Sequence, residues 1–395
     1  MSKKLLVIGA GLAQVDAIIR AQEIGYFILA SDGSPDAVGL RHADKSRIID
    51  VKDVRANLDW AREEKIDGVI SYAMDVALPT VLAIRETLEL PGLGRLPMEV
   101  SRDKSQQRKR FKKAGLSQPA FEVVDNDRDA ERAARKLGFP LVIKPVDNSG
   151  SRGVTVIKDA SQLSEAYLTA LQHIVKGQII LEQYIQGTEL TVEGLSIKGE
   201  HHILAISDKF KPEGPYRVAT QLAYPAAITP LQEKQVIALI RGALDAAEVD
   251  NTPTHSEVIL TLDDPQLVEI GCRGGGFYVF TRVVEATSGY DIVGNWTRMC
   301  AGDPAEDVRI VKKGVVLRFY TATPGKLVSV EGLENAQLCE GVETDLFLKQ
   351  GDAIPELKTD GSRTGWMIVR GKDRAHAVAQ ADRVSAMVKF NTEPL

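Results

Sequence analysis

Residues 142–154 read VIKPVDNSGSRGV, an apolar, strand-like run that ends at Lys144 and is followed by a loop of small residues. A second strand-like run continues to Lys158. The backbone N–H groups and hydroxyls of such a loop can donate hydrogen bonds to a phosphate chain, and glycine lets the main chain come close. The lysine precedes the glycines, so the pattern differs from a Walker P-loop. A hairpin with an incidental lysine is the alternative interpretation.

The sequence on both sides of this loop adds charged residues that favour the phosphate interpretation. Upstream, residues 101–114 read as a basic helix with Ser101 as the expected N-cap and Lys104 as a second lysine. Downstream, residues 179–189 read IILEQYIQGTE, an apolar strand that breaks into a polar turn. The polar and aromatic side chains of that segment include Glu182, Tyr184 and Glu189.

Two further glutamates lie late in the chain on neighbouring strand-like segments. Glu257 and Glu269 stand on either side of a DDP turn at residues 263–265. Carboxylate oxygens are ligands that Mg²⁺ prefers, and one or two carboxylates together with phosphates make its usual shell. Alone, such a pair would more often be an exposed strand face. Together with the phosphate-type loop, the pair predicts a metal site.

In this order the segments resemble the ATP-grasp superfamily. The resemblance is carried by Lys104, the Lys-Pro loop at 144–154, the E-x-Y-I-x-G-x-E segment at 182–189 and the two acidic strands, and it covers essentially the whole chain. It implies an α/β fold class, with α+β character in the ATP-binding part. The expected domains are a Rossmann-like domain at 1–100, an ATP-grasp domain at 101–305 with a lid subdomain at about 115–186, and a small C-terminal α/β domain at 306–395.

The resemblance also implies a place for each part of ATP. Two lysines would neutralise the α- and β-phosphates, the glycine loop would close over the β/γ end, a strand end would line the adenine slot, and a carboxylate would accept hydrogen bonds from the ribose hydroxyls. The phosphate lysines are Lys104 and Lys144, and the glycine loop holds Ser149, Gly150, Ser151 and Gly153. The residues of the adenine slot are Glu182, Tyr184 and Ile185, and the ribose carboxylate is Glu189.

The same resemblance makes Glu257 and Glu269 the ligands of one or two Mg²⁺ ions, for which Mn²⁺ could substitute. The family pattern on the second strand is E-x-N-x-R, whereas this chain has E-I-G-C-R at 269–273. Gly271 replaces the asparagine that normally shares the second metal, so water or another ligand must complete that shell.

Arg273 is expected to be catalytic together with Lys144. A guanidinium at this place can hold the transferring phosphoryl group or the oxyanion of a tetrahedral intermediate. A structural arginine that pairs with a local carboxylate is the alternative.

Two features resemble the L-amino-acid (dipeptide) ligases within the superfamily. They are the RGGG run at 273–276 with EATSGYD at 285–291, and the C-terminal stretches GKLVSVEG at 325–332 and RTGW at 363–366. The implied reaction is ADP-forming. A carboxylate attacks the γ-phosphate of ATP, and an amine then displaces phosphate from the acylphosphate to form an amide.

Candidate substrate residues follow from position alone. Asp75 could pair with a substrate amine or cap a helix, and His255 shares a strand face with Glu257. Gly275 and Gly276 could let a small substrate pack against the main chain or form a tight turn. Weaker candidates for the substrate pocket are Lys209, Arg217 and Gln221.

The first hundred residues read as short apolar strands, near 5–8, 27–30 and 69–70, that alternate with amphipathic helices, which is typical of a parallel sheet. Later in the chain we expect a long helix at 231–247 and an Ala-rich helix at 375–387. Gly9 and Gly11 form a turn after the first strand, and Asp32 lies about twenty residues further on, as in a dinucleotide fingerprint. Gln14 occupies the place of the third glycine, so we interpret this turn as scaffold. A nucleotide-binding dehydrogenase or a non-catalytic sensor remains an alternative function, as does an ATP-grasp carboxylase that activates bicarbonate.

Composition sets the limits of these interpretations. The 395-residue chain carries a formal net charge of −5 and no long basic run, so nucleic acid is not an expected partner. No apolar run reaches the length of a membrane span, and the three cysteines are scattered, so we expect a cytoplasmic protein without a disulfide framework. The expected partners are small carboxylates and amines, and a homodimer is left open.

Overall fold

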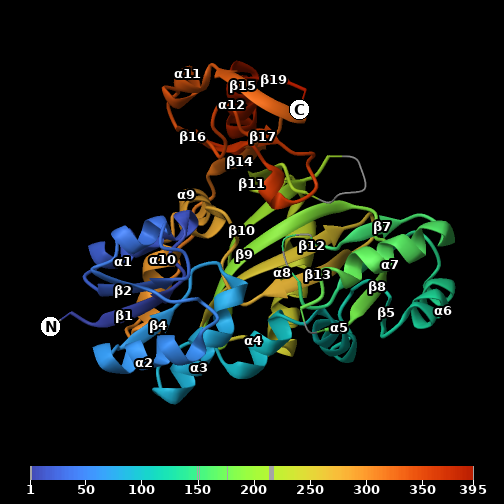
Figure 1. The fold of residues 1–395 in the computed structure, drawn as a ribbon. Coiled ribbons are helices and arrows are strands. Elements are labelled where there is room, and N and C mark those ends of the chain that lie inside the picture. Colours follow the sequence, from blue (N-terminus) through green and yellow to red (C-terminus); the bar gives the residue numbers. More distant parts are fainter. Residues whose placement is uncertain (1, 149, 151, 176, 213–217, 395) are drawn as a thin grey trace.

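The computed structural model describes residues 2–148, 150, 152–175, 177–212 and 218–394 (Figure 1). The chain begins with a parallel four-stranded sheet in the order β3-β2-β1-β4, with helices packed around it. The strands expected near residues 5–8, 27–30 and 69–70 are confirmed, whereas β3 was not predicted. The elements are β1 (Lys4–Ile8), α1 (Val15–Glu23), β2 (Phe27–Asp32), β3 (Lys45–Ile48), α2 (Val54–Glu64), β4 (Gly68–Ile70) and α3 (Leu78–Thr87).

Two short helices connect this domain to the rest of the chain, α4 (Arg95–Ser101) and α5 (Lys104–Lys113). The expected N-cap at Ser101 was wrong, because Ser101 is the last residue of α4 and its hydroxyl donates to the Met98 carbonyl oxygen. Asp103 caps α5 instead, since its side chain accepts hydrogen bonds from the backbone N–H groups of residues 105 and 106. The cap places Lys104 at the first turn of α5.

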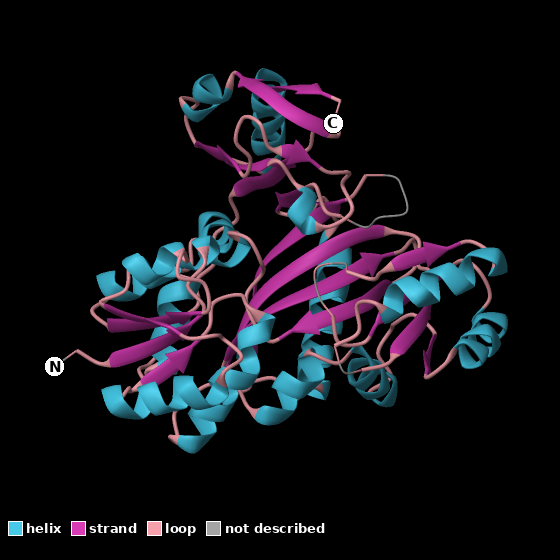
Figure 2. Ribbon diagram, in the orientation of Figure 1, coloured by secondary structure: helices cyan, strands magenta, loops and turns pink. Residues whose placement is uncertain are grey.

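A small antiparallel sheet in the order β5-β8-β6-β7 lies within the range predicted for the lid, and we call it the lid below (Figure 2). Helices α6 and α7 pack against it, and alanines and leucines of these helices share a hydrophobic core with the strands. Lys144 lies near the end of the central strand β6, next to the glycine loop. The elements are β5 (Phe121–Val124), α6 (Asp127–Leu137), β6 (Leu141–Pro145), β7 (Thr155–Ile157), α7 (Leu163–Leu171) and β8 (Ile179–Gln183).

An eight-stranded antiparallel sheet forms the centre of the molecule, in the order β13-β12-β9-β10-β11-β14-β18-β16. The last three strands of this order come from the C-terminal part of the chain, so one sheet joins the two regions. Helix α8 (Pro230–Ala246) packs on it after a Thr229 capping box, close to the expected 231–247. The strands are β9 (Thr188–Ile197), β10 (Glu200–Phe210), β11 (Gln221–Tyr224), β12 (Thr252–Leu260), β13 (Pro265–Gly271), β14 (Gly314–Tyr320), β16 (Val342–Leu346) and β18 (Gly365–Gly371).

The remaining C-terminal elements form a separate small lobe at the top of Figure 1. A three-stranded sheet in the order β17-β15-β19 belongs to this lobe, and α12 packs against β14 and β18. The late helix expected at 375–387 is confirmed as α12. The elements are β15 (Gly325–Glu331), α11 (Leu333–Gln337), β17 (Ala353–Ile354), α12 (Arg374–Met387) and β19 (Lys389–Glu393).

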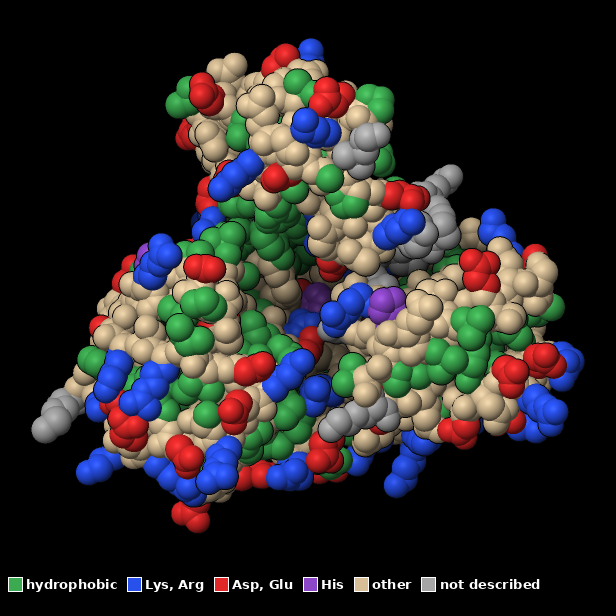
Figure 3. Space-filling model, in the orientation of Figure 1, with side chains coloured by type: hydrophobic (Ala, Val, Ile, Leu, Met, Phe, Trp, Pro, Cys, Tyr) green, Lys and Arg blue, Asp and Glu red, His purple; other side chains and the backbone are tan. Residues whose placement is uncertain are grey.

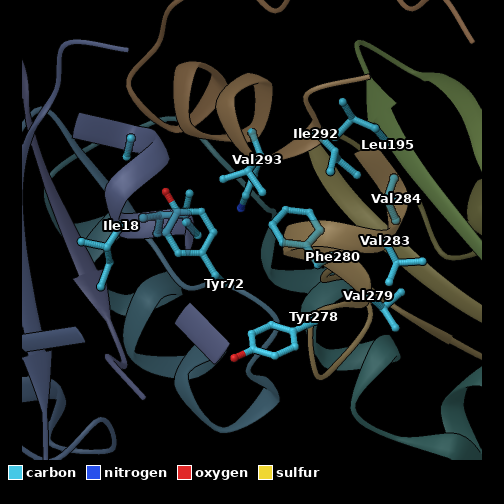
Figure 4. Packing of buried hydrophobic residues seen from close by; sticks show 14 of the residues in the cluster. Ile18, Tyr72, Leu195, Tyr278, Val279, Phe280, Val283, Val284, Ile292 and Val293 are labelled. Atoms are coloured by element: carbon cyan, nitrogen blue, oxygen red, sulfur yellow. The ribbon is translucent and has the colours of Figure 1, made fainter. Parts of the chain in front are cut away.

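A buried core fixes the N-terminal sheet to the central sheet. It is built on residues 279–283, α9 (Val284–Ser288) and α10 (Ile292–Cys300), which lie between the two sheets (Figure 4). Tyr72 and Phe280 meet there, and the Tyr72 hydroxyl lies 2.7 Å from the Thr297 hydroxyl. Burial of this apolar surface holds the N-terminal domain against one face of the central sheet, next to the cleft described below. Over the described residues, no helix has the length and apolarity needed to cross a membrane.

Candidate active site

A cleft of about 620 Å³ opens between the lid, the central sheet and the C-terminal loops. Figure 3 shows this hollow with basic, acidic and histidine side chains gathered inside it. Most residues predicted from the sequence line it, whereas Gly153, Asp75, Gln221 and Gly275 do not. Ser149, Ser151 and Arg217 lie outside the described residues. The predicted residues that line the cleft are Lys104, Lys144, Gly150, Glu182, Tyr184, Ile185, Glu189, Lys209, His255, Glu257, Glu269, Arg273 and Gly276.

Lys144 and Glu182 form a buried ion pair across neighbouring lid strands. Lys144 Nζ lies 2.7 Å from Glu182 Oε2, and Arg108 Nε lies 2.8 Å from Glu182 Oε1. Burial alone would raise the pKa of the Glu182 carboxyl, but the charges of Arg108 and Lys144 outweigh it and hold that pKa at about 2. Burial lowers the pKa of Lys144. The Glu182 carboxylate therefore anchors two cations at the lid side of the cleft.

Lys104 reaches the cleft from the first turn of α5. Its Nζ donates to the Asn148 carbonyl oxygen at 2.8 Å and lies 3.0 Å from Glu269 Oε2. Burial would lower the pKa of Lys104, but the Glu269 carboxylate raises it above the usual value. Lys104 thus links the glycine loop of the lid to the acidic strand of the central sheet.

Glu257 and Glu269 lie directly opposite each other on β12 and β13. Opposed residues of antiparallel strands point to the same side of a sheet, so both carboxylates face the cleft, as the lining of the cleft confirms. Burial would raise the pKa of Glu257, but Lys209 at 2.5 Å holds it well below the usual range. The pair supplies the hard oxygen ligands that the predicted metal site requires.

His255 lies beside these carboxylates and is held by Glu193. His255 Nδ1 is 2.6 Å from Glu193 Oε1, and its Nε2 is 3.8 Å from Glu257 Oε1. Burial would lower the pKa of the imidazole, but the Glu193 carboxylate raises it to about 9. Glu193 is almost fully buried, so it fixes the orientation of the ring, whose other nitrogen is on the side of Glu257.

Arg273 joins the N-terminal domain to the site through Asp75. Arg273 Nη2 lies 2.9 Å from Asp75 Oδ2, and Nη1 donates to the Gly274 carbonyl oxygen at 2.8 Å. The Asp75 side chain caps neither of the two helical turns that begin at residues 75 and 78, and Asp75 is not among the residues that line the cleft. The proposed pairing of Asp75 with a substrate amine stays a prediction, and in the structure its carboxylate supports Arg273.

The three glycines after Arg273 have different surroundings. A Cβ at Gly274 would lie 2.0 Å from the Phe280 ring, and one at Gly275 would lie 2.5 Å from a Val279 methyl carbon. A Cβ at Gly276 would meet no atom within 4 Å. Close packing leaves no room for a side chain at Gly274 or Gly275, and Gly276 alone of the three lines the cleft. The substrate contact expected at Gly275 stays a prediction.

Glu189, predicted to bind ribose, lies between two lysines of β10 and the segment after it. Its Oε1 is 3.2 Å from Lys209 Nζ and 2.5 Å from Lys211 Nζ. Lys209 thus bridges Glu189 and Glu257, the carboxylates expected at the two ends of the nucleotide. The weak expectation for Gln221 is not met, since its side chain accepts from Arg318 and does not line the cleft.

The charged residues that sequence reasoning missed include Arg108, Glu193 and Lys211, which contact the predicted site residues. Arg108 follows Lys104 by four residues on α5, so the two share a helix face, and this spacing was a readable signal. Lys211 follows Lys209 at the two-residue spacing of a strand. Glu193 carried no local signal, because its partner His255 is 62 residues away in the sequence.

Side chains of the N-terminal domain itself make the hydrogen bonds around the turn at Gly9 and Gly11. The Asp32 carboxylate accepts hydrogen bonds from the backbone N–H groups of Ala10 at 2.8 Å and Ser34 at 2.9 Å. Gln14 is buried and donates to the Tyr72 carbonyl oxygen. Asp32, the expected ribose ligand of a dinucleotide, is thus used inside the turn, which supports its interpretation as scaffold.

Comparison with protein families matches two parts of the chain. The ATP-grasp domain model matches residues 137–280, which hold the glycine loop, the buried Lys144–Glu182 pair and both acidic strands. The chain contains an ATP-grasp domain. Residues 318–393, which follow it, match the model described as L-amino acid ligase C-terminal domain 2.

Individual proteins resemble the chain over nearly its whole length. The formate-dependent phosphoribosylglycinamide formyltransferase of Synechococcus sp. (strain CC9311) is 24% identical over 98% of this chain and 97% of that protein. The crystal structure of L-amino acid ligase from Bacillus licheniformis superposes with a TM-score of 0.87 at 23% identity, covering 99% of both chains. The biotin carboxylase domain of Hydrogenobacter thermophilus 2-oxoglutarate carboxylase, solved with MgADP and bicarbonate, gives 0.79 at 18% identity and covers 99% of this chain and 91% of that one.

These findings confirm the ATP-grasp fold, its α/β class and the recognition of a ligase related to the L-amino acid ligases. The match of residues 318–393 to an L-amino acid ligase domain favours neither the carboxylase nor the dehydrogenase over the ligase. The domain boundaries and the roles of individual residues stay predictions.

Proposed function

We propose that this protein is an ATP-dependent, ADP-forming ligase that joins a small carboxylate, such as an amino acid, to an amine through an acylphosphate. One observation carries the proposal. Lys104 and Lys144 on one side and the opposed pair Glu257 and Glu269 on the other face a single cleft. Cations for phosphates and carboxylates for a metal ion are thereby assembled in the ATP-grasp domain.

In this proposal ATP lies with its adenine at the lid. Ile185 and Tyr184 line that end of the cleft, and Glu189 is the carboxylate for the ribose hydroxyls. Lys104 and Lys144 bind the α- and β-phosphates. The glycine loop from Ser149 to Gly153, with Gly150 on the cleft wall, covers the β/γ end.

The donor set fits magnesium. Glu257 and Glu269 offer carboxylate oxygens from opposed positions of neighbouring strands, and Gly271 offers no side chain to a second ion. We propose one protein-held Mg²⁺ at these glutamates, with Mn²⁺ as a substitute. When bound, the ion offsets the negative charge that develops on the phosphates.

The chain's own residues then account for the two steps. In the first, a substrate carboxylate oxygen bonds to the γ-phosphorus, the bond from that phosphorus to the β–γ bridging oxygen breaks, and ADP leaves. Arg273 holds the transferring phosphoryl group through its positive charge and its N–H donors. Asp75 fixes the orientation of this guanidinium. In the second, the amine nitrogen bonds to the acyl carbon, phosphate departs with its bonding electrons, and the nitrogen releases its proton to solvent.

His255 and Gly276 complete the proposed substrate contacts beside the metal carboxylates. The imidazole is a fixed donor held by Glu193, and Gly276 lets a small substrate approach the main chain. A cleft that closes around the acylphosphate excludes water and so protects the acylphosphate from hydrolysis.

The test is a screen of ADP release with Mg²⁺-ATP over pairs of amino acids. Lys144→Met and Glu269→Gln are expected to lower turnover at least a hundredfold, whereas Lys158→Met, at an exposed lysine of the same lid, leaves it unchanged. Full turnover by both site variants contradicts the site. ADP release that requires bicarbonate and no amine contradicts the ligase and favours the carboxylase reaction. Light scattering of the same preparations tests the homodimer, which we also leave as a proposal.

A further inference from the structure

Two groups of apolar side chains line the cleft in addition to its charged residues. The first belongs to the lid, where Val142, Val156 and Ile185 line the wall beside Lys144. The proposed function gives this region to adenine. The second region lies on the central sheet and the C-terminal loops, and the proposed function leaves it without an occupant.

The second region follows from the register of the central sheet. Leu222 of β11 is paired with Lys209 of β10 on one side and with Leu317 of β14 on the other, so the three side chains share a face. On β12 and β13 the same wall carries Glu257 and Glu269. The wall thus changes from acidic to apolar along the strand order β13-β12-β9-β10-β11-β14.

Aromatic rings complete this apolar region. Phe319 lies two residues after Leu317 on β14, and the Phe277 ring centroid is 5.3 Å from those of both Phe319 and Phe347. All these side chains line the cleft, and Phe347 is 40% exposed. A partly exposed phenylalanine beside two others forms a wall for another apolar group rather than a closed core.

Arg363, just before β18, brings a single cation into this region. It is 9% exposed, and its guanidinium carbon lies 3.7 Å from the centre of the Phe319 ring. Nε and Nη2 donate to the Ala219 carbonyl oxygen at 3.1 and 2.7 Å, and Nη2 also pairs with Asp360 at 2.8 Å. Nη1 has no acceptor among the described residues. A buried guanidinium with an open donor is suited to an anionic group such as a carboxylate.

We propose that this region, made of Ala219, Leu222, Phe277, Leu317, Phe319 and Phe347 with Arg363, binds the amine substrate, an α-amino acid with an aliphatic or aromatic side chain. The apolar wall takes the side chain, and Arg363 takes the carboxylate. In the central sheet β11 is the third strand from β12, which is about 14 Å at the usual strand spacing. A substrate carboxylate bound to Arg363 therefore lies away from Glu257 and Glu269. This carboxylate stays unreacted. The amine of the same molecule then faces the centre, where the acylphosphate forms. This inference rests on the proposed ligase function and names its amine substrate.

The experiment compares amine substrates with a fixed carboxylate donor in the ADP-release assay. Leucine and phenylalanine are expected to have KM values at least tenfold below those of aspartate and lysine. Leucinamide, which lacks the carboxylate, is expected to have a KM at least tenfold above that of leucine. Arg363→Gln raises the KM for leucine at least tenfold and leaves the KM values of leucinamide and ATP unchanged. Arg370→Gln, at a more exposed arginine of β18, changes none of them.

A second variant tests the aromatic wall without disturbing the core. Phe347→Ala is expected to raise the KM for phenylalanine at least fivefold, whereas Phe139→Ala, at a similarly exposed phenylalanine of the lid, has no effect. If ADP release with amines is present but aspartate or lysine is preferred, or if leucinamide equals leucine, the inference is wrong and the ligase function stands. If nucleotide binds but no amine supports ADP release, the proposed function fails and this inference fails with it.

Discussion

Lys209 Nζ lies 2.5 Å from Glu257 Oε1 and 3.2 Å from Glu189 Oε1, so one ammonium group joins the proposed metal carboxylate to the proposed ribose carboxylate. Glu269 is paired in the same way with Lys104. Both carboxylates of the proposed metal site thus already have a cationic partner. A metal ion must therefore compete with lysines, and phosphates that attract these lysines would release the carboxylates to the ion.

We expect Mn²⁺ alone to bind the protein at least tenfold more weakly than Mn²⁺ in the presence of ADP. Lys209→Met removes the competing charge and is expected to strengthen the binding of Mn²⁺ alone by about tenfold, since one charge contact at the edge of water is worth about 1–4 kcal/mol. Electron paramagnetic resonance of free Mn²⁺ measures both. Lys198→Met, at an exposed lysine, is the control. Equal binding of Mn²⁺ by wild type and Lys209→Met would show that Lys209 does not compete.

The Glu182 carboxyl gives the protein a defined acid sensitivity. Its pKa of about 2 in the folded state lies below the usual 4.5, so its contribution to stability is present above pH 4.5 and is lost as the pH falls towards 2. At neutral pH this contribution is about 3 kcal/mol. Urea unfolding between pH 7 and pH 3 should show a decline that Glu182→Gln flattens. Glu165→Gln, on the exposed side of α7, keeps the wild-type decline. The assignment fails if both variants show the same pH profile.

Removing the Glu182 charge also has a cost at neutral pH. Arg108 and Lys144 are both buried, and Glu182→Gln leaves them without a negative partner. Breaking a buried pair in this way is expected to lower the free energy of unfolding by roughly 3–5 kcal/mol. Adding Arg108→Met to Glu182→Gln removes one of the two buried cations that have lost their negative partner. The double variant should therefore recover part of the lost free energy of unfolding. Denaturant titration of the single and double variants measures it, and a further loss in the double variant would contradict the account.

Arg273 and Asp75 should separate in their effects on the reaction. Arg273→Ala removes the group proposed to hold the transferring phosphoryl, so kcat should fall about 100- to 1000-fold with little change in ATP affinity. Asp75→Asn leaves the guanidinium present but less firmly held, and a smaller loss of about tenfold in kcat is expected. Single-turnover kinetics and nucleotide binding measure the two effects. If Asp75→Asn were as damaging as Arg273→Ala, Asp75 would have a direct part in the reaction.

The three neighbouring glycines should differ sharply when each is changed to alanine. Gly274→Ala forces a Cβ into the Phe280 ring and is expected to lower the free energy of unfolding by about 1–3 kcal/mol. Gly276→Ala meets open space, so it should fold normally and change only KM for the substrate. Thermal unfolding and the ADP-release assay distinguish these outcomes. Equal loss of stability in both variants would contradict the structure of this turn.

Local sequence signals determined the elements and the chemistry. Apolar periodicity predicted the strands of the N-terminal sheet and α8, because the repeat of side chains along a strand or helix is set by neighbouring residues. Most charged residues that line the cleft between Lys104 and Glu269 were recognisable by their order along the chain, whereas Lys211 was not. Where local signals compete, the sequence was less decisive, and Asp103 rather than Ser101 became the cap of α5.

Only the tertiary structure decided which of these residues meet. Glu193 holds His255 across 62 residues, and Arg108 holds Glu182 across 74. Asp75 reaches Arg273 from another domain, and Arg363 enters the cleft from the C-terminal region. Such contacts depend on the strand order of the central sheet and on the core that fixes the N-terminal domain against it. Since no local pattern encodes a strand order, most residues of the site were readable from the sequence, whereas the contacts between them were not.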